Sequence, residues 1–292
     1  MWKSGSGLME AMITLDFDEI HVWGPKLSGH MSHLIPLELA RQAISAGRPG
    51  YIEDAAKIFF SDVYQDKARF TAEVVAWIEA QTVTAYHGSR LGGAEVDALK
   101  REGLTALSAE RRREPLRKKL SNDPRWCETK FDVAFTELVR GQSWGKREGQ
   151  VHATISRGGL INGFNHYLTY GSEFDQCLLT LLFGSASKEL LAQYGVPTLV
   201  QLAIPGGKAL AAANPYTLNS NECPNLAREI VEVWTYWLAD PTLAVANLEY
   251  DCGLVFDHDV PPEWIVSIDS QTVVSASRRK ATNDRADTPL DH

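Results

Sequence analysis

Hydrophobic residues in the first third of the chain recur at helical spacing. Within residues 52–63 and again within residues 70–78, apolar side chains fall three to four positions apart, which places them on one face of a helix. Residues 1–35 mix glycine, proline and histidine around one short apolar run, and this composition indicates irregular structure. We expect residues 1–81 to form a largely helical N-terminal extension.

The rest of the chain alternates between short apolar runs and amphipathic segments. Apolar runs bounded by turn residues predict strands, and apolar side chains at helical spacing predict helices. The expected strands are residues 83–86, 151–156, 198–204, 245–256 and 264–268, and the expected helices are residues 94–102, 127–139, 174–182 and 226–237. From residue 275 the chain is polar, charged and aperiodic, so we expect residues 274–292 to be a disordered tail.

Composition and charge limit the classes of partner. Hydrophobic residues make up 44% and charged residues 23% of the 292 positions, as in ordinary soluble globular proteins. The 29 basic and 37 acidic side chains leave a net charge of −8, which argues against nonspecific nucleic-acid binding by the whole surface. No apolar run reaches the roughly 18 residues that cross a bilayer. We therefore expect no membrane partner, and either a cytoplasmic location or delivery into a target cell by a dedicated secretion system.

Neither the cysteines nor the histidines are spaced like metal ligands. The four cysteines lie far apart with no paired C-x-x-C spacing, which indicates neither a zinc site nor a disulfide framework. His152, His166 and His258 follow no recognised metal-binding pattern. We expect no metal ion in the functional site.

A strongly basic segment follows Ser108. Residues 111–119 contain six arginine and lysine side chains, and Pro115 interrupts the expected helix. One interpretation is a solvated or mobile loop and helix beside the functional cleft. The other is that these bases steer a phosphate-rich or acidic target toward the cleft.

The sequence places a histidine and a glycine at the end of the first expected strand of the folded domain. The strand ends at Tyr86, and His87 and Gly88 follow directly, before a helix that ends at Gly103. Histidine can donate and accept hydrogen bonds from opposite ring edges, and glycine lets a ligand approach the backbone. The pattern is typical of a binding site, although a purely structural histidine at a strand end would give the same pattern.

Three segments together resemble the ADP-ribosyltransferase superfamily in its histidine–tyrosine–glutamate form, the type of diphtheria toxin and the PARP enzymes. The segments are residues 86–90, residues 165–174, and residues 248–250 followed by residues 260–265. The order histidine, tyrosine, glutamate along the chain is the order of that family. The resemblance covers residues 82–273, with a long insertion between the first two segments.

The resemblance implies roles for particular residues. His87, Tyr170 and Glu249 correspond to the catalytic residues: His87 would hold the ribose of NAD, Tyr170 would stack on the nicotinamide, and Glu249 would stabilise the reacting ribose. Gly88 and Ser89 would contribute to NAD binding. Tyr167 competes with Tyr170 for the stacking position and is a further candidate for NAD binding.

Two other acidic residues compete with Glu249 for the catalytic position. Glu173 lies three residues beyond Tyr170, where its other interpretation is to stabilise the first turn of the following helix. Glu263 follows two prolines, which favours a structural turn.

The resemblance also implies a fold and an activity. We expect an α+β protein in which residues 82–273 form a catalytic domain with a split antiparallel β-sheet. The expected activity is that of an NAD-dependent mono-ADP-ribosyltransferase, with NAD as substrate, nicotinamide as product and a protein or nucleic acid as acceptor. A bacterial toxin, effector or defence enzyme of this kind would have an antitoxin or immunity protein as partner. The alternatives are an RNA 2′-phosphotransferase or nucleic-acid-modifying enzyme on the same fold, and a non-catalytic binding module.

Overall fold

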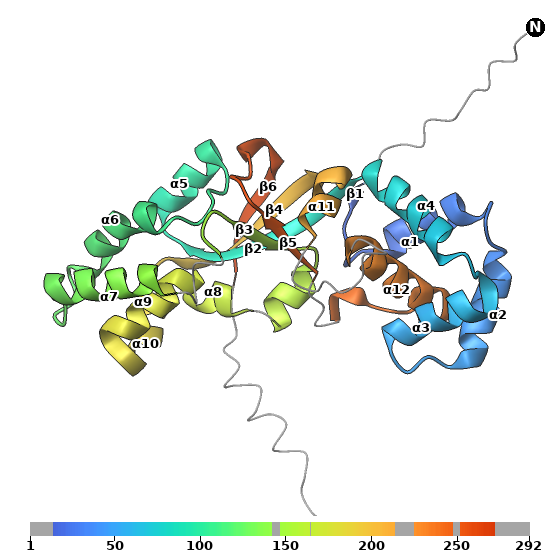
Figure 1. Ribbon diagram of the computed structural model, residues 1–292, viewed down its shortest axis with the longest axis horizontal. Coiled ribbons are helices and arrows are strands. Elements are labelled where there is room, and N and C mark those ends of the chain that lie inside the picture. Colours follow the sequence, from blue (N-terminus) through green and yellow to red (C-terminus); the bar gives the residue numbers. More distant parts are fainter. Residues whose placement is uncertain (1–13, 142–146, 164, 214–224, 248–251, 272–292) are drawn as a thin grey trace, which may run out of the picture. The chain divides into compact units, whose positions relative to one another are not determined.

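The computed structural model describes residues 14–141, 147–163, 165–213, 225–247 and 252–271 (Figure 1). In these residues the protein is α+β, with N-terminal helices that precede a six-stranded, mostly antiparallel sheet. The predicted fold class and the helical character of the N-terminal region are confirmed at this level. The irregular structure expected for residues 1–35 is wrong for residues 20–31, which form a helix because Ile20, Trp23, Leu27 and Met31 bury one helical face. None of the described helices combines the length and the apolar character needed to cross a bilayer. The predicted tail, residues 274–292, lies outside the described residues.

The strands of the sheet come from the whole length of the chain. They are β1 (Thr14–Leu15), β2 (Thr82–Leu91), β3 (Val151–Thr154), β4 (Val196–Pro205), β5 (Gly253–Phe256) and β6 (Ile265–Ser270). The order is β5-β3-β2-β4-β6, and β1 pairs in parallel with the start of β2. Strand β2 therefore has β3 on one side and β4 on the other.

Strand β2 is longer than the sequence predicted, so His87 lies within the strand and not at its end. Pairing with β3 and β4 lets the strand continue to Leu91. Gly88 lies inside this strand and is buried, with side chains packed against its backbone. A Cβ atom at Gly88 would lie 3.2 Å from Leu160 and 3.3 Å from Leu168, closer than most real contacts.

The described chain divides into two compact units, each formed by three segments of sequence. The first unit comprises Met1–Ala85, Thr154–Gly159 and Leu202–Val255. Its helices are α1 (Ile20–Met31), α2 (Leu37–Gly47), α3 (Ile52–Ile58), α4 (Lys67–Glu79), α11 (Gly206–Ala212) and α12 (Asn225–Ala239). Helix α12 packs against α2, α3 and α4, as Figure 1 shows, so the N-terminal helices share a core with a helix from late in the chain.

Large aromatic side chains form the core of the first unit. Trp23, Phe59, Phe70 and Trp234 are fully buried, and the ring centroids of Phe59 and Phe70 are 5.0 Å apart. The indole of Trp234 donates a hydrogen bond to the Ser28 hydroxyl at 3.0 Å, so its buried N–H is satisfied. The predicted amphipathic stripes of residues 52–63 and 70–78 are confirmed as the faces that build this core.

The second unit comprises Tyr86–Ala153, Leu160–Gln201 and Phe256–His292. Its helices are α5 (Gly93–Glu102), α6 (Ala109–Leu120), α7 (Glu128–Arg140), α8 (His166–Tyr170), α9 (Glu173–Phe183) and α10 (Ser187–Gln193). Buried side chains of α6, α7, α9 and α10 form one apolar cluster around Phe131, Phe135 and Phe174. Ser108 and Ser172 begin α6 and α9 by accepting hydrogen bonds from Arg111 N and Asp175 N, which satisfies an amide at each helix N-terminus.

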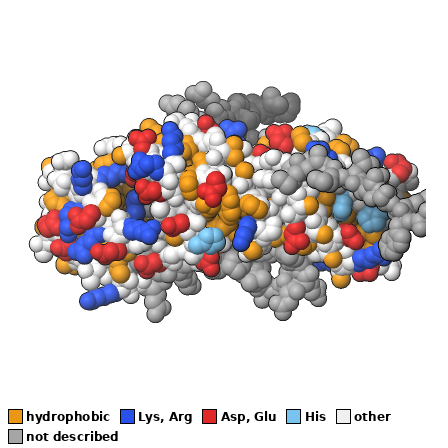
Figure 2. All heavy atoms as spheres, turned by 90° about the horizontal axis from the view of Figure 1, so that it is seen from above, with side chains coloured by type: hydrophobic (Ala, Val, Ile, Leu, Met, Phe, Trp, Pro, Cys, Tyr) orange, Lys and Arg blue, Asp and Glu red, His pale blue; other side chains and the backbone are white. Residues whose placement is uncertain are grey.

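The basic segment is a continuous helix, α6, that runs through Pro115, so the predicted interruption is wrong. Ion pairs to α7 hold it in place: Arg113 and Arg117 bind the Asp132 carboxylate at 2.8 and 3.2 Å, and Arg117 Nε lies 2.7 Å from Glu128. These contacts tie the residues of α6 before and after Pro115 to helix α7. Figure 2 shows basic and acidic side chains interspersed at the end of the picture where α6 and α7 lie.

The predicted strand of residues 245–256 is shorter in the structure. Residues Val245–Asn247 form a 3₁₀ turn, residues 248–251 lie outside the described residues, and β5 begins at Gly253. A second 3₁₀ turn, Pro262–Trp264, precedes β6, as the two prolines suggested.

Candidate functional site

A cavity of about 200 Å³ lies in the second unit, between strands β2 and β3 and the first turns of three helices. Glu95 comes from α5, Arg111 and Arg112 come from α6, and Glu173 and Asp175 come from α9. From β2, β3 and the segment before β3, the lining includes His87, Gly88, Ser89, Arg147, Gln150, Val151 and His152, and Tyr167 comes from α8. The cavity therefore combines imidazole, aromatic, cationic and anionic side chains.

Strand β3 fixes the protonation of His87. His87 Nδ1 lies 2.7 Å from the carbonyl oxygen of His152, and only a protonated nitrogen can donate to that oxygen. Burial lowers the pKa of His87 below its ordinary value, so the ring is neutral near pH 7. In a neutral ring with a proton on Nδ1, Nε2 is a hydrogen-bond acceptor.

His152 is a second neutral imidazole beside the cavity. Burial, together with the positive charge of Arg147, lowers the pKa of His152 to about 4. Its Nε2 lies 3.1 Å from the amide oxygen of Gln150, a contact that requires a proton on Nε2. The other ring nitrogen, Nδ1, is then an acceptor.

The lowered pKa of His152 predicts a loss of stability in acid. The unfolded chain, with a pKa near 6.5, binds a proton that the folded chain binds only near pH 4. The neutral, buried His152 therefore costs the folded protein no stability above pH 6.5. As the pH falls toward 4, proton binding increasingly favours the unfolded chain, and the free energy of unfolding decreases. The decrease in the free energy of unfolding that His152 causes is about 1 to 2 kcal/mol, a value reduced because the side chain is partly exposed. Urea unfolding at pH 7.5, 5.5 and 4.5 should show a flatter pH dependence for His152→Phe than for the wild type; equal slopes would contradict the assignment.

Two side chains clamp Tyr167 at the cavity. Its hydroxyl donates to Glu173 Oε1 at 2.8 Å and accepts from Arg147 Nη1 at 2.9 Å. Arg147 Nε in turn lies 2.9 Å from Glu173 Oε2. Gly171, with a φ of +80°, ends α8 and lets α9 begin two residues later, which brings Glu173 back toward Tyr167. The aromatic ring of Tyr167 is therefore held in one orientation.

This clamp also sets the charges of its members. Burial and the Glu173 charge raise the pKa of Tyr167 to about 12, so the phenol stays protonated. His166, whose Nε2 lies 3.9 Å from Glu173 Oε1, the hydrogen bond from Tyr167 and the Arg147 charge lower the pKa of Glu173 below its ordinary value. Glu173 is thus ionised, and Arg147 neutralises its charge.

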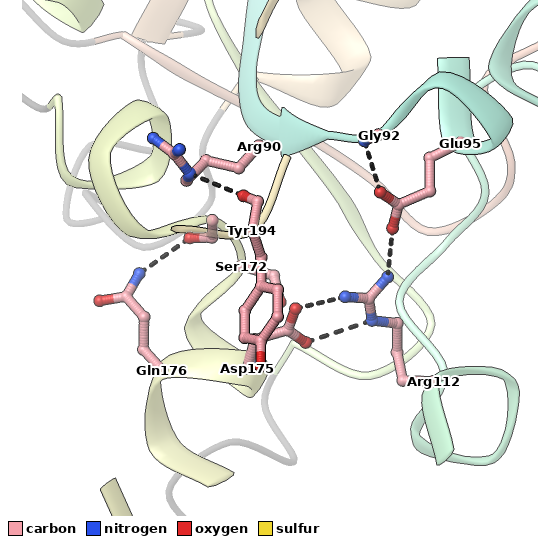
Figure 3. A network of polar contacts seen from close by, with 9 residues as sticks. Arg90, Gly92, Glu95, Arg112, Ser172, Asp175, Gln176 and Tyr194 are labelled. Carbon is pink, nitrogen blue, oxygen red and sulfur yellow. Dashed lines mark hydrogen bonds and ion pairs between the residues drawn. The ribbon is translucent and has the colours of Figure 1, made fainter. Parts of the chain in front are cut away.

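A second polar network joins the three helices whose first turns line the cavity (Figure 3). Arg112 donates to both carboxylate oxygens of Asp175, and its Nη1 lies 3.7 Å from Glu95. Glu95 also accepts a hydrogen bond from the backbone N–H of Gly92 at 2.7 Å, which fixes the start of α5. Attraction to Asp175 raises the pKa of Arg112, so the guanidinium charge is shared between two carboxylates.

Arg90, the last residue of the motif at residues 86–90, has a structural role. Its guanidinium donates to five backbone carbonyls, those of Leu168, Thr169, Ala192, Tyr194 and Gly195, at 2.7 to 3.4 Å. Figure 3 shows the contact with Tyr194. These bonds tie the last turn of α8 and the end of α10 to β2, and thereby support the wall that carries Tyr167.

The structure brings together four of the residues that the sequence proposed for NAD binding. His87, Gly88, Ser89 and Tyr167 all line the cavity. Tyr170 is not part of the described lining: it packs against the apolar cluster of the second unit, and Lys188 Nζ lies 5.7 Å from its ring centroid.

The three candidate glutamates have different positions. Glu173 lines the cavity, and it also lies in the first turn of α9, as its structural interpretation predicted. Glu263 lies in the Pro262–Trp264 turn and is not part of the described lining. Glu249 lies outside the described residues, so its place in the site stays a prediction.

Sequence reasoning missed several lining residues. His152 was considered only as a metal ligand, although its place on a strand next to that of His87 could have indicated a shared site. No sequence signal singled out Arg147, because its partners Tyr167 and Glu173 are distant in the chain. Within the part of the chain that the structure describes, no group of three or more His, Cys, Asp or Glu side chains is arranged to hold a metal ion.

Comparisons of the chain with protein-family models, with curated proteins and with solved structures give no match.

Proposed function

We propose that the protein is an NAD-dependent mono-ADP-ribosyltransferase that transfers ADP-ribose to a macromolecular acceptor and releases nicotinamide. The observation that carries this proposal is that His87, Gly88, Ser89 and Tyr167 line one cavity. These residues come from two of the three segments that resemble the histidine–tyrosine–glutamate transferases. The finer fold assignment, a split antiparallel sheet of the transferase type, is part of the same proposal.

The size of the cavity suits one end of the dinucleotide. Pockets for drug-sized ligands usually have volumes of roughly 300–1,000 Å³, and this cavity has about 200 Å³. We assign it to the nicotinamide riboside end of NAD, where the reacting bond lies. In this proposal the neutral His87 accepts a hydrogen bond from a ribose hydroxyl through Nε2, and Gly88 is part of the same cavity wall.

The clamped ring of Tyr167 is the better stacking surface for the nicotinamide. An aromatic ring held by Arg147 and Glu173 keeps its orientation without a ligand, so less conformational entropy is lost on binding. Tyr167 therefore takes the role that the resemblance gave first to Tyr170. A stacking or cation–π contact with the nicotinamide contributes about 0.5–2 kcal/mol.

The reaction needs a carboxylate that the clamp does not supply. Cleavage of the nicotinamide–ribose bond develops positive charge on the ribose, as in glycoside hydrolysis, and a nearby carboxylate stabilises that charge. Glu173 is ionised but already paired with Arg147 at 2.9 Å. We therefore keep Glu249 as the proposed catalytic residue, with Glu173 as its competitor.

The charge of the cavity favours this activity over an RNA 2′-phosphotransferase. Of the six bases in residues 111–119, only Arg111 and Arg112 belong to the described lining. Arg112 is bound to two carboxylates, and Arg111 Nη1 lies 3.8 Å from Asp259. Bases neutralised in this way attract a polyphosphate chain weakly.

A nucleic-acid acceptor at the outer surface remains within the proposal, as does a toxin or effector role with a partner immunity protein.

Replacing His87 with alanine tests the proposal. We expect NAD binding to weaken about tenfold and nicotinamide release to slow, because one hydrogen bond to the ribose is lost. The variant should stay folded with a modestly lower melting temperature, because the change removes one hydrogen bond inside the protein, that to the His152 carbonyl. Calorimetry measures NAD binding, chromatography measures the released nicotinamide, and a thermal melt measures stability. His258→Ala, an exposed histidine paired with Asp257, is the matched control.

Two results would contradict the proposal. An unfolded His87→Ala protein would assign His87 a structural role, and a wild-type protein that binds no NAD would favour the non-catalytic binding module.

A further inference from the structure

Two imidazole rings from neighbouring strands line the same cavity. His87 lies on β2 and His152 lies on β3, and the backbone carbonyl of His152 accepts the hydrogen bond from His87 Nδ1. The resemblance gave a role to the first of these histidines and none to the second.

Each ring uses one nitrogen to hold its position and leaves the other for a ligand. His87 donates through Nδ1 to a backbone oxygen, and His152 contacts the amide oxygen of Gln150 through Nε2. Among the described residues, no side chain or backbone group forms a hydrogen bond with the remaining nitrogen of either ring. Since both rings are neutral, His87 Nε2 and His152 Nδ1 are two acceptors at one cavity.

Two acceptors of this kind match a ligand with two hydroxyl donors. A metal ion would need further ligands, and the described residues hold no third metal-ligating group in place. A phosphate would prefer donors to neutral acceptors. A vicinal diol, such as the one carried by a ribose ring, offers two O–H groups that can donate at the same time.

We propose that His152 is a second ribose-binding residue, and that His87 and His152 each accept a hydrogen bond from one hydroxyl of the nicotinamide ribose. This inference rests on the proposed function, because it takes NAD as the ligand. It adds a specificity element: the pair selects a donor with both ribose hydroxyls over one that lacks either. The Gln150 contact is part of the arrangement, since it holds the His152 ring in the acceptor form.

Binding of matched ligands to two variants tests the proposal. His152→Phe keeps an aromatic ring of similar size and removes both nitrogens, whereas His152→Asn keeps an acceptor oxygen near the position of Nδ1. The ligands are NAD and its analogues that lack the 2′- or the 3′-hydroxyl of the nicotinamide ribose. Calorimetric titration gives the dissociation constants, and thermal melts show that each variant is folded.

The pattern of losses identifies a direct contact. We expect His152→Phe to weaken NAD binding about tenfold, the loss of roughly one hydrogen bond, and His152→Asn to stay within about threefold of the wild type. One of the two analogues lacks the hydroxyl that His152 binds. The His152→Phe variant and the wild type should bind this analogue with equal affinity, because the hydrogen bond to His152 is absent in both complexes.

Other outcomes overturn the inference. Equal weakening of NAD and of both analogues by His152→Phe would mean that His152 only supports the fold of the cavity, and unchanged NAD binding would mean that it contacts no hydroxyl. Should His152→Phe fail to fold, a His152→Asn protein that loses affinity equally for all three ligands contradicts the proposal. Absence of NAD binding by the wild type would instead remove the proposed function and, with it, this inference.

Discussion

Replacing Asp175 with asparagine is expected to lower the free energy of unfolding by about 2–4 kcal/mol, because the change leaves the partly buried guanidinium charge of Arg112 with too little compensation. Asp175 is 6% exposed and receives two hydrogen bonds from Arg112. Only Glu95, 3.7 Å away, would remain to balance the Arg112 charge. Because the network joins α5, α6 and α9 at the cavity, NAD binding should weaken as well. Urea unfolding followed by circular dichroism measures the change.

An exposed ion pair supplies the matched control. Glu102 pairs with Arg101 at 3.3 Å, and its side chain is 58% exposed. The substitution Glu102→Gln should change stability by at most about 0.5 kcal/mol, since exposed ion pairs contribute little. Equal effects of the two substitutions would show that the Arg112–Asp175 pair does not support the fold.

Replacing Glu249 with glutamine is expected to lower turnover by about 10²–10³ while NAD affinity changes little. The positive charge on the ribose appears only as the bond to nicotinamide breaks, so the carboxylate stabilises the transition state more than bound NAD. Steady-state rates of nicotinamide release, together with calorimetric NAD binding, separate the two effects. The variant keeps the shape of the side chain and removes its charge.

The competing glutamates serve as comparisons for Glu249. Glu173→Gln should mainly disturb the Tyr167 clamp and raise the NAD concentration needed for half-maximal rate, because Glu173 binds both Tyr167 and Arg147. Glu263→Gln should have little effect, since Glu263 lies in a turn away from the described cavity lining. Full activity of Glu249→Gln with loss of activity in Glu173→Gln would assign the catalytic role to Glu173.

Local signals predicted the parts of the fold that depend on nearby residues. Helix α5 was predicted to end before Gly103, and it ends there with Gly103 at a φ of +82°. A Cβ atom at this position would lie 2.0 Å from the Val260 carbonyl oxygen, so the glycine is required by backbone conformation and by a close contact. The first reason is visible in sequence and the second is not.

Tertiary contacts explain the predictions that failed. Local propensity suggested that Pro115 would interrupt a helix, but ion pairs from Arg113 and Arg117 to Asp132 hold α6 against α7 on both sides of it. In the same way, β2 continues through Gly88 because two neighbouring strands pair with it. Partners distant in sequence decided both outcomes.

The candidate site was predicted in part. The resemblance identified His87, Gly88, Ser89 and Tyr167, which line the cavity, but spacing alone could not choose between Tyr167 and Tyr170. The choice follows from packing, because Tyr170 lies against the apolar cluster of the second unit. Arg147 acts through contacts with Tyr167 and Glu173, which lie 20 or more positions further along the chain, and no local pattern reveals such contacts.

Transfer of label from NAD tests the central proposal most directly. The purified protein is incubated with NAD labelled in its adenylate phosphate, with and without cell lysate, and both released nicotinamide and label bound to macromolecules are measured. We predict nicotinamide release in both conditions, label on a macromolecule when lysate is present, and a strong decrease of both signals with His87→Ala. If folded wild-type protein releases no nicotinamide, with or without lysate, the assignment as an ADP-ribosyltransferase is contradicted.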